Sequence, residues 1–214
     1  STNMNSNEVI ANRALELMGK SPGDYQIIHP LNDVNRSQST NDVYPTALRL
    51  ALIFEIELLD QSLTDLKKSY EAKAKEFADI LKMGRTQLQD AVPITLGQEF
   101  QAFAVSTSKD IERLHELRPL LAEVNLGGTA VGTELNTPKG YTKKVVAELS
   151  KLSGVKLTSA KDLVEATQSS GVLVTFSSVL KRIAVKQSKI ASDLRVLSSG
   201  PRAGFNEINL PEKQ

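Results

Sequence analysis

Two polar clusters contain the side chains best suited to chemistry, Ser37–Asp42 and Gly84–Asp90. In the first, the hydroxyl and amide groups of Ser39, Thr40 and Asn41 can donate hydrogen bonds beside the backbone N–H groups that begin a helix. That arrangement suits a carboxylate or phosphate, because donors and partial positive charge lie together. The alternative is plain capping, since the same residue types are preferred at any helix N-terminus.

The second cluster alternates polar with apolar residues, which predicts a partly buried loop whose polar groups need partners. Arg85 and Asp90 could satisfy each other there. Thr86 and Gln87 would then be neutral donors held on a fixed support. A hydrogen-bonded connector between two helices is the alternative explanation of the same residues.

A long helix should separate these clusters. Between Asp42 and Phe77 the apolar residues recur in steps of three and four, which predicts an amphipathic helix. Such a helix is about 50 Å long at the usual rise per residue. Because one cluster precedes this helix and the other follows it, a single chain cannot easily bring both to one ligand. A second copy of the chain would have to supply one of them.

The same periodicity predicts further helices at 5–18, 95–124, 142–153 and 169–199. Proline and glycine mark loops at 19–38, 82–93 and 125–140, and the second of these could hold a short irregular strand. Pro45 is expected in the first turn of the long helix, where proline is tolerated. In the helix at 5–18, one apolar side is expected to consist of Val9, Ile10, Ala14, Leu17 and Met18.

The fold class predicted from these stripes is all-α, a long-helix bundle. Aromatic residues make up 5% of the chain, and evidence for strands is thin. Long helices with sustained heptad-like faces often bury those faces against helices of partner chains. Self-association is therefore expected.

Composition excludes several classes of function. Basic and acidic residues nearly cancel at a net charge of +1, so nothing favours nucleic acid or a membrane surface as a partner. The absence of cysteine excludes disulfides, thiol catalysis and zinc–thiolate sites. His29 and His115 form no metal-ligand pattern, and no cofactor is expected. No apolar run reaches the length of a membrane span, so a cytoplasmic protein is expected.

Other polar features have structural explanations. Gly127–Thr133 resembles a phosphate cradle, but its spacing matches neither Gly-x-Gly-x-x-Gly nor a Walker motif. Close backbone packing explains these glycines better. His29 is expected to be structural and His115 a helix-face residue. Asp162 and Glu165 are expected to be solvated.

Taken together, these stretches resemble the aspartase/fumarase superfamily. The segments that carry the resemblance cover nearly the whole chain in consistent order: Ser1–Asn12, Ser37–Asp42, Gly84–Glu99, Gly128–Thr133 and Ser199–Gly204. The resemblance implies reversible α,β-elimination on a four-carbon dicarboxylate to give fumarate, in a homotetramer built around long helices. It also implies that 1–38 ends an N-terminal helical domain and that 39–214 begins, without completing, the central bundle domain.

The resemblance also implies roles for individual residues. Ser39, Thr40 and Asn41 would bind a substrate carboxylate, joined by Thr86 and Gln87 from a neighbouring subunit. A base removes the proton beside one carboxylate, and preorganised neutral donors stabilise the extra negative charge that results. This implication favours carboxylate binding at residues 39–41, although the same residues can also cap the helix.

Different segments of the sequence resemble family members that act on different substrates. Gln87 and the ending Glu207–Glu212 resemble aspartase-like members, which release ammonia from L-aspartate, whereas Gly127–Thr129 is nearer the fumarase version. Fumarate hydratase or another lyase of the superfamily stays an alternative, and a non-catalytic helical assembly scaffold is an alternative of another class. Glu134 stands where the family usually has glycine.

Both ends of the sequence are expected to be internal to a longer protein. By the resemblance, a serine-bearing loop with the general base would begin after Gln214, and a further threonine would precede Ser1. We therefore expect the isolated chain to be inactive.

Overall fold

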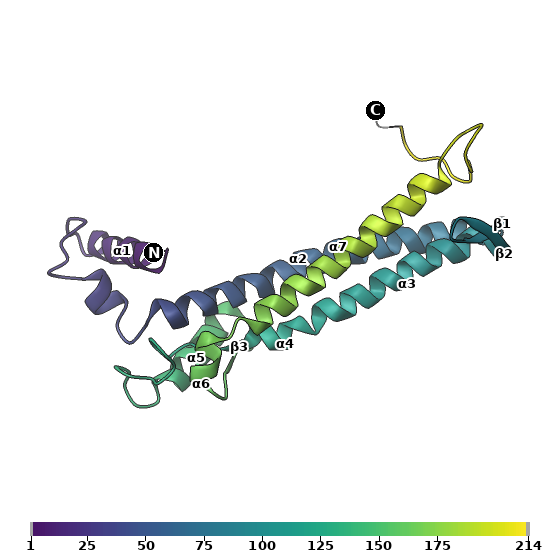
Figure 1. The fold of residues 1–214 in the computed structure, drawn as a ribbon. Helices are drawn as coiled ribbons and strands as arrows, with labels where there is room; N and C mark the ends of the chain where they lie inside the picture. Colours follow the sequence, from purple (N-terminus) through teal and green to yellow (C-terminus); the bar gives the residue numbers. More distant parts are fainter. Residues whose placement is uncertain (1, 213–214) are drawn as a thin grey trace. The chain divides into compact units, whose positions relative to one another are not determined.

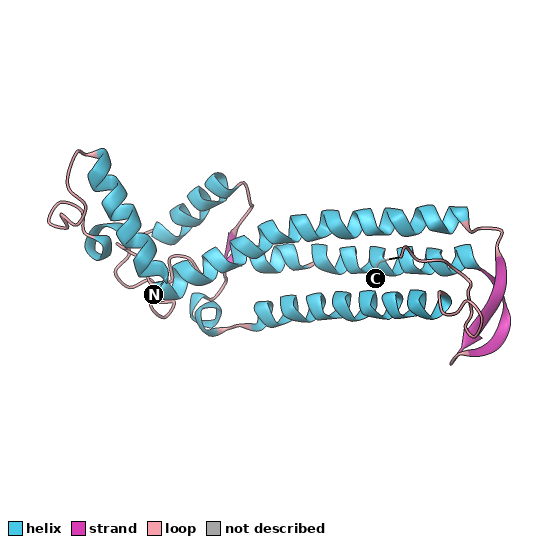
Figure 2. Ribbon diagram, turned by 90° about the horizontal axis from the view of Figure 1, so that it is seen from above, coloured by secondary structure: helices cyan, strands magenta, loops and turns pink. Residues whose placement is uncertain are grey.

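The computed structural model describes residues 2–212, most of which are helical (Figure 1, Figure 2). The helices are α1 (Thr2–Leu17), the short π-helix η1 (Pro30–Val34), α2 (Thr40–Glu76), α3 (Leu96–His115), α4 (Leu117–Ala122), α5 (Tyr141–Ser153), α6 (Leu163–Gln168) and α7 (Gly171–Leu197). The strands are β1 (Leu81–Thr86) with β2 (Gln89–Thr95), antiparallel, and β3 (Glu123–Val124) with β4 (Thr158–Ser159), parallel. The predicted all-α fold with long helices is confirmed. No described helix combines the length and apolar content that crossing a membrane requires.

Internal packing divides the chain into two units, which are described separately. Unit 1 comprises Ser1–Glu55 and Arg118–Val172, and unit 2 comprises Ile56–Leu117 and Leu173–Gln214. The long helix α2 begins in unit 1 and ends in unit 2. The division into 1–38 and 39–214 was inferred from the family resemblance, not from packing, and stays a prediction.

The core of unit 2 lies among the later part of α2, α3 and α7, which run side by side in Figure 1 and Figure 2. Its buried members are Ala74, Leu96, Phe100, Phe103, Ile190 and Leu197. The Phe103 ring meets the rings of Tyr70 and Phe100 edge-on, at centroid distances of 5.7 and 5.6 Å. Such edge-to-face pairs stabilise the core beyond the area they bury.

The helix predicted at 95–124 is interrupted near Glu116. Its start is as expected, because Thr95 and Gln98 form a capping box: Gln98 N donates to Thr95 Oγ1 at 3.1 Å, and Thr95 N donates to Gln98 Oε1 at 2.9 Å. Pro119 has no N–H to donate to the carbonyl of His115, and its ring crowds that carbonyl. The chain therefore breaks into α3 and α4, and then enters β3 where helix was predicted.

The core of unit 1 gathers around α5 and the β3–β4 pair, and its buried members are Val124, Leu126, Val146 and Leu157. Gly140 and Gly154, both with left-handed φ angles, bound α5 close to its predicted limits. Helix α6 was not predicted. It begins because Asp162 Oδ1 accepts hydrogen bonds from the N–H groups of Val164 and Glu165 at 2.8 and 3.1 Å.

The apolar side predicted for the first helix is wrong. Val9, Ile10, Leu17 and Met18 are exposed, whereas the buried positions of α1 are Asn3, Asn7, Ala11 and Leu15. Asn3 and Asn7 both donate to Asn35 Oδ1, at 3.2 and 2.9 Å. An amide network therefore joins α1 to the segment after η1, and this tertiary contact overrides the local apolar pattern.

Candidate functional site

Ser39 caps α2 in unit 1. The N–H of Asn41 donates to Ser39 Oγ at 3.1 Å, and the N–H of Ser39 donates to Asp42 Oδ1 at 2.9 Å. The capping explanation is therefore confirmed for this residue. Because Ser39 Oγ acts here as an acceptor, its own O–H proton is still available to a ligand.

Thr40 and Asn41 keep donors as well. Thr40 Oγ1 accepts a hydrogen bond from Asn3 Nδ2 at 3.2 Å, which leaves the threonine O–H proton available. Asn41 Nδ2 donates one of its two hydrogens to the carbonyl of Ala130 at 2.7 Å. Three consecutive side chains thus retain donors beside the positive end of a helix, where a carboxylate is stabilised.

Asp42 joins the start of α2 to the glycine-rich loop of unit 1. Its side chain is fully buried, and Oδ2 accepts hydrogen bonds from the N–H groups of Gly127 at 3.1 Å and Thr129 at 2.9 Å. Burial raises the pKa of Asp42, and the hydrogen bonds from backbone N–H groups offset only part of that rise. The loop is therefore held against residues 39–41.

Pro45 lies beyond the first turn of α2, one turn later than predicted. Since proline has no N–H, the carbonyl of Asn41 loses its normal helical donor. Asn125, which is buried, replaces that donor: its Nδ2 lies 3.0 Å from Asn41 O and 3.1 Å from Thr167 Oγ1. The backbone at Asn41 is thereby fixed from the side.

The glycines of Gly127–Thr133 serve close packing, as predicted. A Cβ on Gly127, whose φ is 94°, would lie 2.5 Å from Thr142 Oγ1. A Cβ on Gly132, whose φ is 90°, would lie 2.4 Å from the Leu163 backbone. Glu134 takes a left-handed φ of 57°, so the loop keeps a conformation that glycine usually supplies.

Thr86 and Gln87 lie at the tip of the β1–β2 hairpin, in unit 2. Gln87 and Leu88 form the turn with φ angles of 51° and 63°, as in the tight turns that suit hairpins. All three side chains are exposed in the single chain, Leu88 by 67%. The prediction of a partly buried loop is therefore confirmed for Gly84 and Arg85 but wrong for the tip in a single chain, because a two-stranded ribbon has no second layer to cover its tip.

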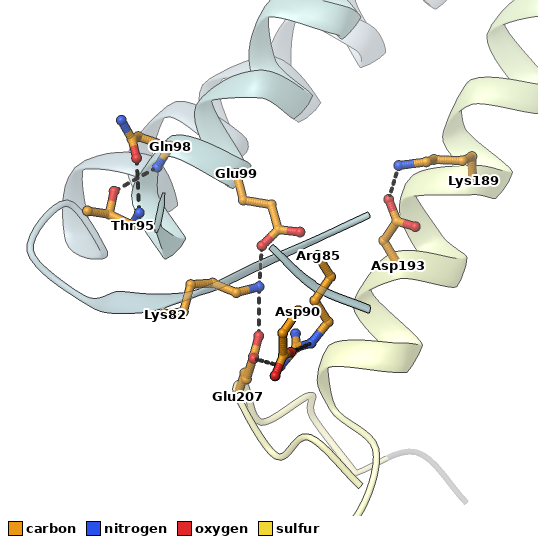
Figure 3. Close-up of polar contacts among 9 residues, drawn as sticks. All are labelled: Lys82, Arg85, Asp90, Thr95, Gln98, Glu99, Lys189, Asp193 and Glu207. Carbon is orange, nitrogen blue, oxygen red and sulfur yellow. Dashed lines mark hydrogen bonds and ion pairs between the residues drawn. The ribbon is translucent and has the colours of Figure 1, made fainter. Parts of the chain in front are cut away.

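Arg85 pairs with Asp90, as predicted, but it lies closer to a second partner, Glu207, which was not predicted (Figure 3). Its Nη2 lies 2.6 Å from Glu207 Oε1, whereas its Nε lies 3.7 Å from Asp90 Oδ1. Asp90 is 75% exposed and Glu207 only 16%, so the Glu207 pair is less screened by water. The hydrogen bond from Arg85 to Glu207 raises the pKa of Arg85.

A cavity of about 530 Å³ lies beside this pair within unit 2. Its wall includes Gln87 at the hairpin tip and charged residues of β1, α3 and α7. The register of the hairpin shifts between Met83 and Arg85, which marks a β-bulge. Gly84 is required there, because a Cβ would lie 2.8 Å from the carbonyl oxygen of Val92.

The remaining polar candidates lie outside both groups. His29 Nδ1 accepts hydrogen bonds from the first N–H groups of η1, which is a structural role, as expected. His115 Nε2 lies 2.9 Å from Asp60 Oδ2 on the outside of unit 2. Asp162, expected to be merely solvated, caps α6.

Asp42, Asn125 and Glu207 hold the candidate segments in place, and none of these contacts was predicted. Their partners are 85, 84 and 122 residues away in sequence. Pro45 was an available signal, because its missing N–H demands a side-chain donor for Asn41. No local pattern identifies Glu207.

Comparisons of the sequence with known proteins find lyases that match along the whole chain. A sequence profile of a family described as lyase matches residues 1–214. The chain is 60% identical over 215 residues to aspartate ammonia-lyase of Pseudomonas aeruginosa and 54% identical over 214 residues to that of Escherichia coli K12. Each alignment covers 100% of this chain, which spans 45% of the length of either relative.

Two solved structures show the same fold. A fumarate lyase:delta crystallin from Brucella melitensis, bound to cobalt, has a TM-score of 0.98 and 59% identity, over 100% of this chain and 46% of that one. A class II fumarase from Schistosoma mansoni has a TM-score of 0.90 and 32% identity, over 95% of this chain and 46% of that one.

Proposed function

The chain belongs to the aspartase/fumarase superfamily of lyases, and from this premise we propose that it supplies carboxylate-binding residues to an aspartate ammonia-lyase. The proposed reaction is the reversible elimination of ammonia from L-aspartate to give fumarate. The observation that carries the proposal is identity of 60% and 54%, over the whole chain, to proteins of that name. Local support comes from the donors that residues 39–41 retain.

The chemistry explains why neutral donors are useful. A base takes a proton from C3 of aspartate, the C2–N bond breaks, and ammonia leaves. Negative charge gathers meanwhile on the carboxylate attached to C3, which needs donors already in place. We assign this carboxylate to Ser39, Thr40 and Asn41, with Thr86 and Gln87. Neutral groups stabilise the developing charge without holding the dianionic ground state too tightly.

The base is not assigned to any residue of this sequence. The isolated chain of 214 residues is therefore expected not to convert aspartate to fumarate. Ultraviolet absorbance of fumarate measures this directly on the purified chain, and turnover by that chain alone would contradict the assignment.

We propose that Thr86 and Gln87 act in a site of a second copy, within a homotetramer. Residues 39–41 lie in unit 1 and the hairpin lies in unit 2, and nearly all of the 37-residue helix α2 lies between them in the chain. The exposure of the hairpin tip suits a surface that another copy covers. Leu58 on α2 and Val174 and Val185 on α7 are also exposed, and they offer apolar surface for self-association.

Thr86→Ala tests the proposal in the natural polypeptide that contains this sequence. Loss of one donor to developing charge should lower kcat by about 100-fold, with the assembly unchanged in size-exclusion chromatography. Thr158→Ala, at an exposed threonine of β4, is the matched control and should leave kcat unchanged. Full activity of Thr86→Ala in an intact assembly would favour a scaffold role for the hairpin.

A fumarate hydratase is the second candidate, supported by the likeness to the Schistosoma fumarase. Aspartate and malate both yield fumarate, so one absorbance assay measures the turnover of each. Comparing the two rates in the natural polypeptide distinguishes the two reactions. We expect turnover of aspartate. Faster turnover of malate would favour the hydratase and overturn the ammonia-lyase assignment.

A further inference from the structure

Glu207 links the C-terminal segment of unit 2 to the first strand of the hairpin (Figure 3). Its Oε1 lies 2.6 Å from Arg85 Nη2, and its Oε2 lies 2.7 Å from Lys82 Nζ. Lys82 Nζ also lies 2.6 Å from Glu99 Oε2 on α3. The four side chains are largely shielded from water, so these ion pairs are stronger than pairs on an open surface.

The segment that carries Glu207 is itself fixed to α7 and to the core of unit 2. The N–H of Glu207 donates to the carbonyl of Leu197 at 2.9 Å, and the N–H of Asn206 donates to that of Ser199 at 2.8 Å. Ile208 packs against the apolar core. Glu207 therefore projects from a rigid support, and its carboxylate can hold β1 in one position.

Fixing Arg85 also limits the movement of the hairpin tip, because Arg85 directly precedes Thr86 in the chain. Its guanidinium is fixed twice, by Glu207 and by the Phe205 ring, whose centroid lies 3.8 Å away. Beyond Arg85 the chain enters the exposed turn at Gln87. The orientation of that turn consequently depends on where Arg85 is held.

The charge state of Glu207 suits this role. Burial raises the pKa of Glu207, but the hydrogen bonds and the positive charges of Arg85 and Lys82 together outweigh burial, and the pKa lies below its usual value. The carboxylate is therefore ionised at neutral pH and keeps both cations paired.

We propose that Glu207 is a positioning residue, which acts through Arg85 to orient Thr86 and Gln87 toward the substrate. The inference rests on the proposed function, since that function assigns Thr86 and Gln87 to the reaction. Glu207 itself is assigned no contact with substrate. Its effect is geometric, because catalytic donors lose efficiency when their support lets them move.

Glu207→Gln in the natural polypeptide tests the proposal. Glutamine keeps the size of the side chain, but it removes the charge and one of the two oxygen acceptors. We expect kcat to fall by about 10- to 100-fold, with KM little changed, because the misplaced donors act mainly in the transition state. Asp193→Asn is the matched control: Asp193 lines the same cavity, but it pairs with Lys189 of its own helix α7 and not with Arg85, so kcat should be unchanged.

A double variant separates positioning from a general loss of structure. If Glu207 acts through Thr86 and Gln87, then adding Glu207→Gln to Thr86→Ala should slow the reaction by a smaller factor than adding it to the unmodified polypeptide. A loss equal to the product of the two single losses would overturn the proposal. If Glu207→Gln does not fold, Arg85→Lys takes its place, since it keeps the charge but loses the planar guanidinium group that contacts both Glu207 and the Phe205 ring.

Amide hydrogen exchange gives a readout that does not depend on activity. Exchange in β1 and β2 should be faster in Glu207→Gln than in the unmodified polypeptide, and unchanged in Asp193→Asn. Unaltered exchange of the hairpin in Glu207→Gln would overturn the proposal. Absence of aspartate turnover in the unmodified polypeptide would instead refute the proposed function, and hydrogen exchange would still decide whether Glu207 holds the hairpin.

Discussion

Asp42 allows a prediction whose size follows from counting hydrogen bonds. Its buried carboxylate accepts from three backbone N–H groups, that of Ser39 at Oδ1 and those of Gly127 and Thr129 at Oδ2. Asp42→Ala would leave all three donors unpaired, at about 1–3 kcal/mol each. The unfavourable burial of a charge disappears at the same time and offsets part of that sum. We expect the free energy of unfolding to fall by about 3–5 kcal/mol.

Asp42→Asn should be milder, for a geometric reason. The amide oxygen can accept from Gly127 and Thr129 together, since both donate to one oxygen in the native protein. Only the N–H of Ser39 then faces an NH₂ group, which predicts a loss of about 1–3 kcal/mol.

Urea denaturation of the natural polypeptide without substrate, followed by circular dichroism, measures the losses in both Asp42 variants. Equal losses in the two variants would refute the count of donors, and so would a larger loss for Asp42→Asn.

Titration of Asp42 and packing in unit 2 give further predictions. Burial raises the pKa of Asp42 in the folded state above its value in the unfolded chain. The pH-dependent contribution of Asp42 to stability is therefore fully present below the unfolded pKa and is lost as the pH rises through the folded pKa. The stability of the native protein relative to Asp42→Asn should therefore decrease across that window in urea titrations at several pH values, and an increase would contradict the sign. Gly97→Ala should lower the free energy of unfolding by about 1–3 kcal/mol, because its Cβ would lie 2.5 Å from the carbonyl oxygen of Ala74; an unchanged melting temperature would argue against this contact. Phe103→Ala should cost about 3–5 kcal/mol, whereas Val105→Ala, at an exposed position of α3, should cost less than about 0.5 kcal/mol, and similar losses for the two would be contrary to the assigned core.

The long helices could be predicted because their signal is local. The apolar period between Asp42 and Phe77 corresponds to α2, and the stripe at 169–199 corresponds to α7. The break at Glu116 was also readable, from Pro119, but the apolar steps on either side of it masked the signal. The burial of the asparagines of α1 could not be predicted, since their partner Asn35 is 32 and 28 residues away in sequence.

Some features of the candidate site could likewise be predicted from the sequence, and others could not. Capping by Ser39 follows from residue type and position alone, and the structure confirms it. The Arg85–Asp90 pair could be predicted because the two residues are near in sequence, whereas the closer pair with Glu207 could not, because Glu207 is 122 residues away. Only the folded chain reveals that Asp90 stays in water while Glu207 is shielded.

Whether two copies share one site is tested most directly by mixing two variants of low activity. Thr40→Ala removes a donor at the start of α2, and Thr86→Ala removes one at the hairpin tip. If each site combines residues from different copies, mixed assemblies formed by unfolding and refolding equal amounts together should have about a quarter of their sites intact. We predict recovery of activity near that fraction. No recovery in assemblies proven to contain both variants would contradict a site shared between copies.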